Sequence, residues 1–168
     1  MLRSRYRTLV LFLVSALAGF ALYTFKYADG ASYLSTDPKA CVNCHIMQPQ
    51  FDSWQKSSHH GVATCNDCHL PQEGLEKWIS KAENGWNHSK AFTLQDFPEP
   101  IRLTEKNAQI LQANCLRCHA DITHAVAAGP EGSADVVQCV HCHRSAGHGD
   151  HVRLGGPWRE SEIPEELR

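Results

Sequence analysis

The stretch Cys41-Val42-Asn43-Cys44-His45-Ile46-Met47 contains the motif that decides the fold of this chain. Two cysteines separated by two residues and followed at once by a histidine are typical of a covalently attached c-type haem, because each thiol adds to a vinyl group and the imidazole is held beneath the iron. The same pattern recurs at Cys65–His69, Cys115–His119 and Cys139–His143. Four copies predict four haems.

The motifs use every cysteine of the chain: Cys41, Cys44, Cys65, Cys68, Cys115, Cys118, Cys139 and Cys142. A single copy could equally be a zinc site or a redox-active pair that happens to precede a histidine. That alternative becomes negligible when four copies consume all eight cysteines. The first copy alone is followed two residues later by a methionine, Met47, the only one besides the initiator.

The spacing of the motifs repeats along the chain. Cys41 and Cys65 are 24 residues apart, and so are Cys115 and Cys139. The second half therefore restates the first, which predicts two dihaem modules at about residues 38–92 and 105–152.

A chain of 168 residues that holds four haems has little room for a conventional core. The porphyrins themselves supply apolar surface, so we expect a mostly α domain of short helices and loops wrapped round the haems, with almost no sheet. Apolar residues at helical spacing predict a short helix over residues 47–58 and longer ones over 75–86 and 105–115.

An uncharged run of 18 residues from Thr8 to Phe25 is long enough to cross a lipid bilayer as a helix. The competing interpretation is a signal peptide cleaved after Ala16-Leu17-Ala18. Apolar sequence continues past that position, which favours a permanent anchor. We expect residues 1–27 to form a cytoplasmic stub and transmembrane anchor, and residues 28–168 to form the haem domain.

Charge is distributed unevenly about this anchor. Arg3, Arg5 and Arg7 precede it, whereas all 18 acidic residues follow it. This pattern predicts a single-pass protein of the inner membrane with a cytoplasmic N-terminus and a periplasmic haem domain. An acidic external domain argues against a nucleic-acid partner. The short connection Asp29-Gly30-Ala31-Ser32 should hold the first haem near the lipid surface.

The single anchor, the four motifs, the run Ser58-His59-His60 and the stretch KAENGWNHS at residues 81–89 together resemble the NapC/NirT family of membrane-anchored tetrahaem cytochromes. The resemblance extends from the anchor to about His148 and is greatest with members that act as the small, quinol-oxidising subunit of cytochrome c nitrite reductase. It leaves the C-terminal arm, from Gly155 onward, unmatched.

The resemblance implies a set of axial iron ligands. It gives Met47 to the first haem with His45 as the fallback, His69 and His148 to the second, His119 and His60 to the third, and His143 to the fourth, whose far side takes a lysine from the partner protein. A thioether in place of an imidazole raises the haem potential, which suits the first electron acceptor. His59 is the fallback for His60, and His151 for His148. His124 and His141 receive no role.

The resemblance further implies a menaquinol dehydrogenase of anaerobic respiration that passes electrons to a periplasmic pentahaem nitrite reductase. Lys81 and His88 lie on one helical face and are the candidates for accepting the quinol protons. Some relatives carry aspartate where this chain has His88, and an imidazole there could also bind the first iron. Without the resemblance, both residues would pass as ordinary surface side chains. Two alternatives remain open at this point, a different terminal reductase such as nitrate reductase, and a passive tethered electron carrier.

Overall fold

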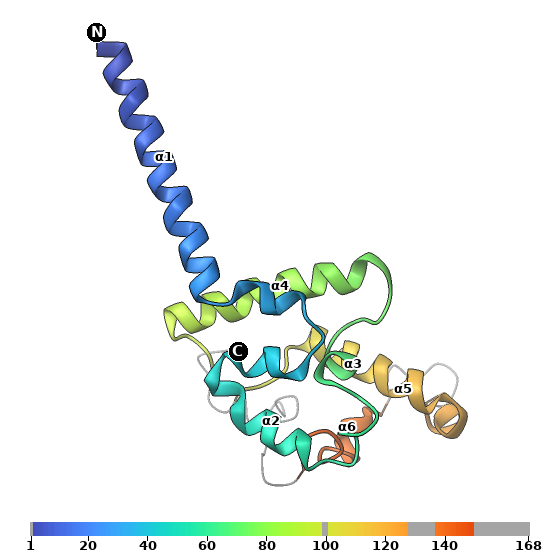
Figure 1. Ribbon diagram of the computed structural model, residues 1–168. Helices are drawn as coiled ribbons and strands as arrows, with labels where there is room; N and C mark the ends of the chain where they lie inside the picture. The colour runs from blue at the N-terminus through green and yellow to red at the C-terminus, as the bar shows by residue number, and fades with distance from the viewer. Residues whose placement is uncertain (1, 99–100, 128–136, 150–168) are drawn as a thin grey trace, which may run out of the picture. The chain divides into compact units, whose positions relative to one another are not determined.

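The computed structural model describes residues 2–98, 101–127 and 137–149 (Figure 1). All regular structure in these ranges is helical, either α or the tighter 3-10 form, and no strand occurs within them. The expected mostly α fold is therefore confirmed for this part of the chain.

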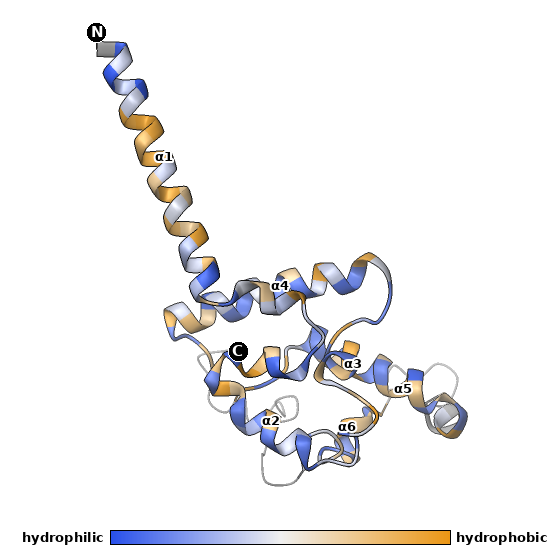
Figure 2. Cartoon of the chain, in the orientation of Figure 1, coloured by the Kyte–Doolittle hydropathy of each residue, from blue (hydrophilic) through white to orange (hydrophobic). Residues whose placement is uncertain are grey.

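The N-terminal helix α1 (Leu2–Tyr27) ends at the last residue of the predicted anchor. Its span Arg3–Tyr27 is long and apolar enough to cross a membrane, with a mean hydropathy of 2.1, and no part of its apolar window is buried within the protein. Figure 2 shows apolar turns following a hydrophilic first turn. Together with the 3-10 helix η1 (Gly30–Leu34), α1 belongs to a compact unit, Met1–Ser35.

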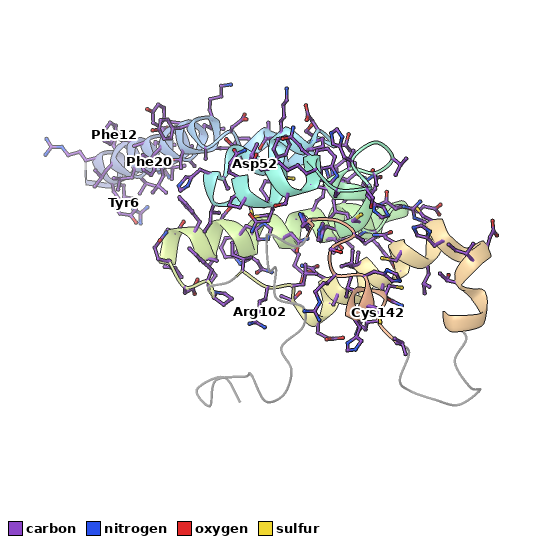
Figure 3. The ribbon with its side chains drawn as sticks, turned by 90° about the horizontal axis from the view of Figure 1, so that it is seen from below. Tyr6, Phe12, Phe20, Asp52, Arg102 and Cys142 are labelled. Atoms are coloured by element: carbon purple, nitrogen blue, oxygen red, sulfur yellow. The ribbon has the colours of Figure 1, made fainter. Side chains whose placement is uncertain are left out.

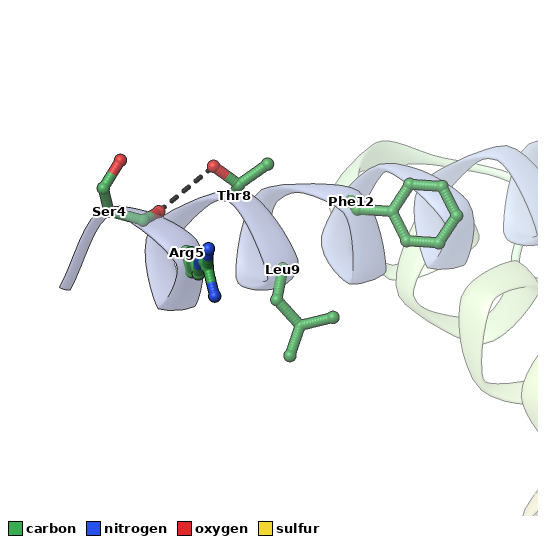
Figure 4. A pocket seen from close by; sticks show the side chains of 5 residues that line it. All are labelled: Ser4, Arg5, Thr8, Leu9 and Phe12. Carbon is green, nitrogen blue, oxygen red and sulfur yellow. Dashed lines mark hydrogen bonds between the residues drawn. The ribbon is translucent and has the colours of Figure 1, made fainter. Parts of the chain in front are cut away.

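The first turns of α1 carry a shallow surface depression (Figure 4). Its lining consists of Ser4, Arg5, Thr8, Leu9 and Phe12. The Thr8 hydroxyl donates a hydrogen bond to the Ser4 carbonyl at 3.1 Å. Since every lining side chain comes from one helix, the depression is a hollow between neighbouring side chains of α1 and not a site enclosed by several elements.

The second compact unit comprises Thr36–Arg168. In chain order its helices are η2 (Pro38–Asn43), η3 (His45–Met47), α2 (Gln48–Gln55), α3 (Cys65–His69), α4 (Gly74–Leu94), α5 (Glu105–Ala127) and α6 (Cys139–Cys142). Figure 3 labels Asp52 on α2, Arg102 just before α5 and Cys142 on α6. The predicted division of this unit into two dihaem modules stays a prediction.

The three helices expected from apolar spacing are present as α2, α4 and α5. Helix α4 ends where Gln95 adopts the left-handed conformation, with φ 57°, and donates its backbone N–H to the Ala91 carbonyl. Helix α5 runs further than predicted, through the third motif, and is kinked at His119, whose φ and ψ are −109° and 17°.

Protein side chains alone make a very small core. Among the described residues, Leu70 and Ala108 are the buried apolar side chains, and Ser80, Lys81 and Asn114 are the buried polar ones. Within the described residues, this small core agrees with the expectation that protein side chains alone build no large conventional interior.

Side-chain hydrogen bonds join the helices where apolar packing is sparse. The buried Asn114 amide of α5 donates to the carbonyls of Cys68 at 2.9 Å and Leu70 at 2.8 Å, at the end of α3. The Gln112 side chain accepts from the Cys139 backbone N–H at 2.9 Å, which ties α6 to α5. These bonds bring the second, third and fourth motifs together around α5.

Candidate haem and substrate sites

The second motif is a short regular helix held by its first turn. Thr64 and Asp67 form a capping box at the start of α3, in which the Thr64 backbone N–H donates to the Asp67 carboxylate at 2.8 Å. Burial alone would raise the pKa of Asp67, but the hydrogen bonds from Thr64 and the charge of Arg117 outweigh it and lower the pKa. The box therefore fixes the backbone that carries Cys65, Cys68 and His69.

The third and fourth motifs share another local geometry. Their histidines adopt similar non-helical backbone conformations, His119 at the kink within α5 at φ −109° and ψ 17°, and His143 at the end of α6 at φ −105° and ψ 37°. Both imidazoles are exposed, as are Cys118 and Cys142. The similarity agrees with the repeat that the cysteine spacing predicts.

The attachment cysteines of successive motifs are neighbours: Cys41 hydrogen-bonds Cys65, Cys68 lies near Cys118, and Cys115 hydrogen-bonds Cys139. The thiol contact lowers the pKa of Cys41 to about 7 and raises that of Cys65. The four attachment points thus form a continuous series in the order of the sequence.

Two histidines far apart in sequence face each other beside the second motif. The rings of His69 and His148 have centroids 6.1 Å apart. Burial, and then the neighbouring His148, lower the pKa of His69 to about 4. Burial also lowers the pKa of His148, against the effect of its hydrogen bond to Gln50. Both imidazoles are thereby kept neutral, the form that binds a metal.

A second histidine pair lies beside the third motif. The ring centroids of His59 and His119 are 6.0 Å apart. The neighbouring His60 is exposed and instead packs edge-on against Trp54, with centroids 4.6 Å apart. The structure therefore brings His59, and not the adjacent His60, to the histidine of the third motif.

Both pairs have the separation that a shared iron requires. Imidazole nitrogens bind metal ions at about 2.0 Å, which places the centroids of two rings on opposite sides of one ion about 6 Å apart. The separations of 6.1 Å and 6.0 Å match that value. The residues present therefore fit two haem irons with histidine on both sides.

Backbone carbonyls orient His148 and His59. Nδ1 of His148 donates to the Gln50 carbonyl at 3.0 Å, and Nδ1 of His59 donates to the Ala146 carbonyl, also at 3.0 Å. A carbonyl can only accept, so each Nδ1 carries the proton and each Nε2 keeps its lone pair for a metal. One short turn, which contains both Ala146 and His148, thus supports both pairs.

The first motif departs from a regular helix. Residues 38–43 and 45–47 form separate 3-10 turns, with Cys44 between them in an extended conformation at φ −88° and ψ 105°. His45 is exposed, whereas Met47 is half-buried. This exposure pattern agrees with Met47 as the iron ligand, which stays a prediction.

Lys81 is buried beside the first motif. Its side chain is 7% exposed, and its ammonium nitrogen lies 5.7 Å from the centroid of the Trp78 ring. Burial and then the charge of Lys77 lower its pKa, while the nearby Cys41 thiol opposes them. The structure thus places the first of the two predicted quinol-site residues next to the first haem attachment.

His88, the second predicted quinol-site residue, is exposed on α4 two turns after Lys81. Desolvation by the surrounding protein nevertheless lowers its pKa, so the ring is neutral at pH 7 and able to accept a proton.

The predicted fallback ligand His151 lies outside the described residues. The His124 backbone belongs to α5, and His141 is exposed on α6. Sequence reasoning missed the carbonyls of Gln50 and Ala146, because a backbone carbonyl leaves no signature in the sequence. The buried Asn114 could have been noticed, since it is a polar residue directly before Cys115.

Comparisons with known proteins agree with this architecture. The family model of the N-terminal region of the NapC/NirT cytochrome c family matches residues 1–152. The chain is 40% identical over 154 residues to the cytochrome c-type protein NrfH of Wolinella succinogenes, a match that covers 86% of this chain and 85% of that protein.

A solved structure is similar as well. The crystal structure of the cytochrome c nitrite reductase NrfHA complex bound to the HQNO inhibitor contains a chain 28% identical to this one, with a TM-score of 0.60, covering 82% of this chain and 90% of that chain. The apolar helix α1 and this kinship identify a membrane protein with covalently bound haem. The chain belongs to the NapC/NirT cytochrome c family.

Proposed function

We propose that this protein is a membrane-anchored menaquinol dehydrogenase that delivers electrons through four c-type haems to the catalytic subunit of a cytochrome c nitrite reductase. The observation that carries the proposal is the buried side chain of Lys81 beside Cys41, the first attachment point of the first haem. The kinship with NrfH and with the NrfHA complex supplies the class of partner.

Each haem has a defined set of residues to hold it. The four cysteine pairs would form the thioether links, and the irons would be held by Met47 for the first haem, His69 and His148 for the second, His119 and His59 for the third, and His143 for the fourth. His59 replaces His60 in this assignment because its ring faces His119 and its Nδ1 is held by a carbonyl. Bound haem iron accepts and releases one electron at a time.

Oxidation of the quinol requires a proton acceptor beside the first haem. Menaquinol loses two electrons and two protons to become menaquinone, so each hydroxyl must give up its proton as electrons leave. The amine of Lys81, whose pKa is lowered by burial, is available as one acceptor, and the neutral ring of His88 as the other. Trp78 supplies an aromatic surface next to the Lys81 ammonium.

The fourth motif provides the exit to the partner. His143 and Cys142 are exposed, so a haem there would be reachable from solvent. In this proposal a lysine of the partner reductase would bind the open side of the fourth haem iron, so that docking of the partner and ligation of the iron are coupled. Three arginines in the first turns of α1 support a cytoplasmic N-terminus and a periplasmic haem domain.

Reduction of the purified full-length holoprotein by a menaquinol analogue tests the proposal. We expect intact mass to give four haems on an uncleaved chain, the quinol to reduce them, HQNO to block that reduction, and nitrite to reoxidise them only after the partner subunit is added. Reduction by dithionite but not by quinol would establish the passive carrier instead. Reoxidation by a nitrate reductase and not by the nitrite reductase would refute the proposed partner.

A further inference from the structure

Helix α4 exposes its apolar face. Leu75, Trp78, Ile79 and Trp86 are 72%, 51%, 53% and 71% exposed, and Ala82 between them is exposed as well. These residues recur at intervals of three and four, so they form one stripe along the helix. We call this set the α4 apolar stripe.

The buried face of α4 is the polar one. Ser80 and Lys81 are buried, and Lys77 and Asn84 are half-buried. Successive residues of an α-helix are turned by about 100°, which sets this polar set nearly opposite to the α4 apolar stripe. A helix of a soluble protein normally turns its apolar face inward, so α4 is inverted.

A haem attached at Cys41 does not account for this inversion. The attachment cysteine that acts on the charge of Lys81 is Cys41, which therefore lies on the polar, inward side of the helix. A porphyrin bound at Cys41 adds apolar surface on that side and leaves the opposite side as it is. The α4 apolar stripe needs another cover, because an exposed patch of large apolar side chains marks an interaction site.

The composition of the stripe favours lipid as that cover. It holds two of the four tryptophans of the chain, and tryptophan is enriched where a protein meets the boundary between headgroups and acyl chains. The stripe itself carries no charge, and Glu83 at its edge is paired with Lys106. An acidic side chain that would repel anionic headgroups is thereby neutralised.

The tether length also favours lipid. The helix long enough to cross a membrane ends at Tyr27, and only residues 28–40 separate it from Cys41. Even fully extended, such a segment spans at most about 45 Å. Cys41 and the adjacent α4 therefore stay within reach of the membrane surface throughout.

We propose that the α4 apolar stripe lies in the headgroup and acyl boundary of the bilayer, so that α4 is a second membrane contact of this protein, parallel to the surface. Such interfacial helices bind by burying one apolar face in the outer part of the lipid layer. The proposal does not depend on the identity of the substrate or of the reductase.

Photo-crosslinking in lipid nanodiscs tests this contact on the full-length holoprotein. Lipids that carry a diazirine in the upper acyl chain should label peptides from residues 75–86, and labelling of α1 in the same sample is the internal standard. The double variant Trp78→Glu, Trp86→Glu should lower labelling of α4 relative to α1 by about tenfold, since a charged side chain is expelled from the boundary. Val62→Glu, at a site that is 83% exposed outside α4, should leave it unchanged.

Three results would overturn the proposal. The first is labelling of α1 with no labelling of α4. The second is equal labelling of α4 in the wild type and the double variant. The third is protection of α4 only when the reductase is added, with crosslinks to that protein or to a second copy of this chain. Haem spectra of each variant establish that the domain has folded, and quinol oxidation, measured separately, reports on the proposed function.

Discussion

The first and second haem motifs have the same five-residue pattern and different structures. The second, Cys65–His69, is a capped helix whose histidine faces His148 at a centroid distance of 6.1 Å. The first, from Cys41 to His45, is broken into two 3-10 turns, and His45 is exposed. The difference comes from residues outside the motif.

At the second motif, His69 and His148 are spaced to hold an iron between two imidazoles. The Gln50 carbonyl fixes the ring of His148. The first motif has the buried Lys81 as its neighbour. A site that only passes electrons can be closed on both sides, whereas a site that oxidises a quinol must admit the substrate and accept its protons. Under the proposed function, the second motif is therefore a transfer site and the first is the reaction site.

Removing Lys81 should have the largest effect on this contrast. Lys81→Met preserves the aliphatic volume and removes the amine, so quinol-dependent haem reduction should fall about 100-fold or more, the usual contribution of a general base. Stopped-flow absorbance with a menaquinol analogue measures this rate. Lys90→Met, at an exposed position of the same helix, is the matched control and should keep the wild-type rate.

The rate of quinol-dependent haem reduction should rise with pH. Only the neutral amine accepts a proton, so the rate should rise with pH as Lys81 deprotonates, below the usual range for a lysine because burial lowers its pKa. Lys77→Met removes a repelling charge, which raises the pKa of Lys81 and shifts the rise to higher pH. The Cys41 thiol becomes an uncharged thioether once haem is attached, so its opposing influence disappears. If the pH profile of the rate is identical in the wild type and Lys77→Met, the role of Lys81 as base is contradicted.

Replacing His59, the proposed distal ligand of the third haem, should have an intermediate effect. His59→Ala removes the ring that faces His119, so one of the four haems should become high-spin, and electron delivery from quinol to nitrite should fall by about 10- to 100-fold. His60→Ala removes a ring that packs on Trp54 and should leave the spin state of every haem as it is in the wild type. Absorbance and electron paramagnetic resonance spectra measure both variants. The opposite outcome would restore the assignment to His60.

The choice between these two histidines illustrates what the sequence could and could not predict. Repeated cysteines predicted the haem attachment, and apolar spacing predicted α2, α4 and α5 because both signals are local. His59 and His60 are adjacent and identical in type, so only their tertiary contacts distinguish them, such as that of His59 with Ala146, 87 residues away. The break at Cys44 and the inverted face of α4 are likewise set by tertiary surroundings that short-range patterns do not encode.

Replacing His88 should have the smallest effect, because its ring is exposed and water can take over part of its role. His88→Leu should slow quinol-dependent reduction by less than about tenfold, which is below the usual contribution of an acid–base group. The lowered pKa of His88 keeps the ring neutral and able to accept a proton at pH 7, whereas at pH values below that pKa the wild-type ring is itself protonated. The difference between the wild type and His88→Leu should therefore be largest at pH 7 and above and vanish as the pH falls, and His88→Asp should recover most of the rate. If His88→Leu matches the wild-type rate at every pH while Lys81→Met remains impaired, His88 is not a proton acceptor for the quinol. Lys81 would then be the single side chain at the first motif that accepts a quinol proton.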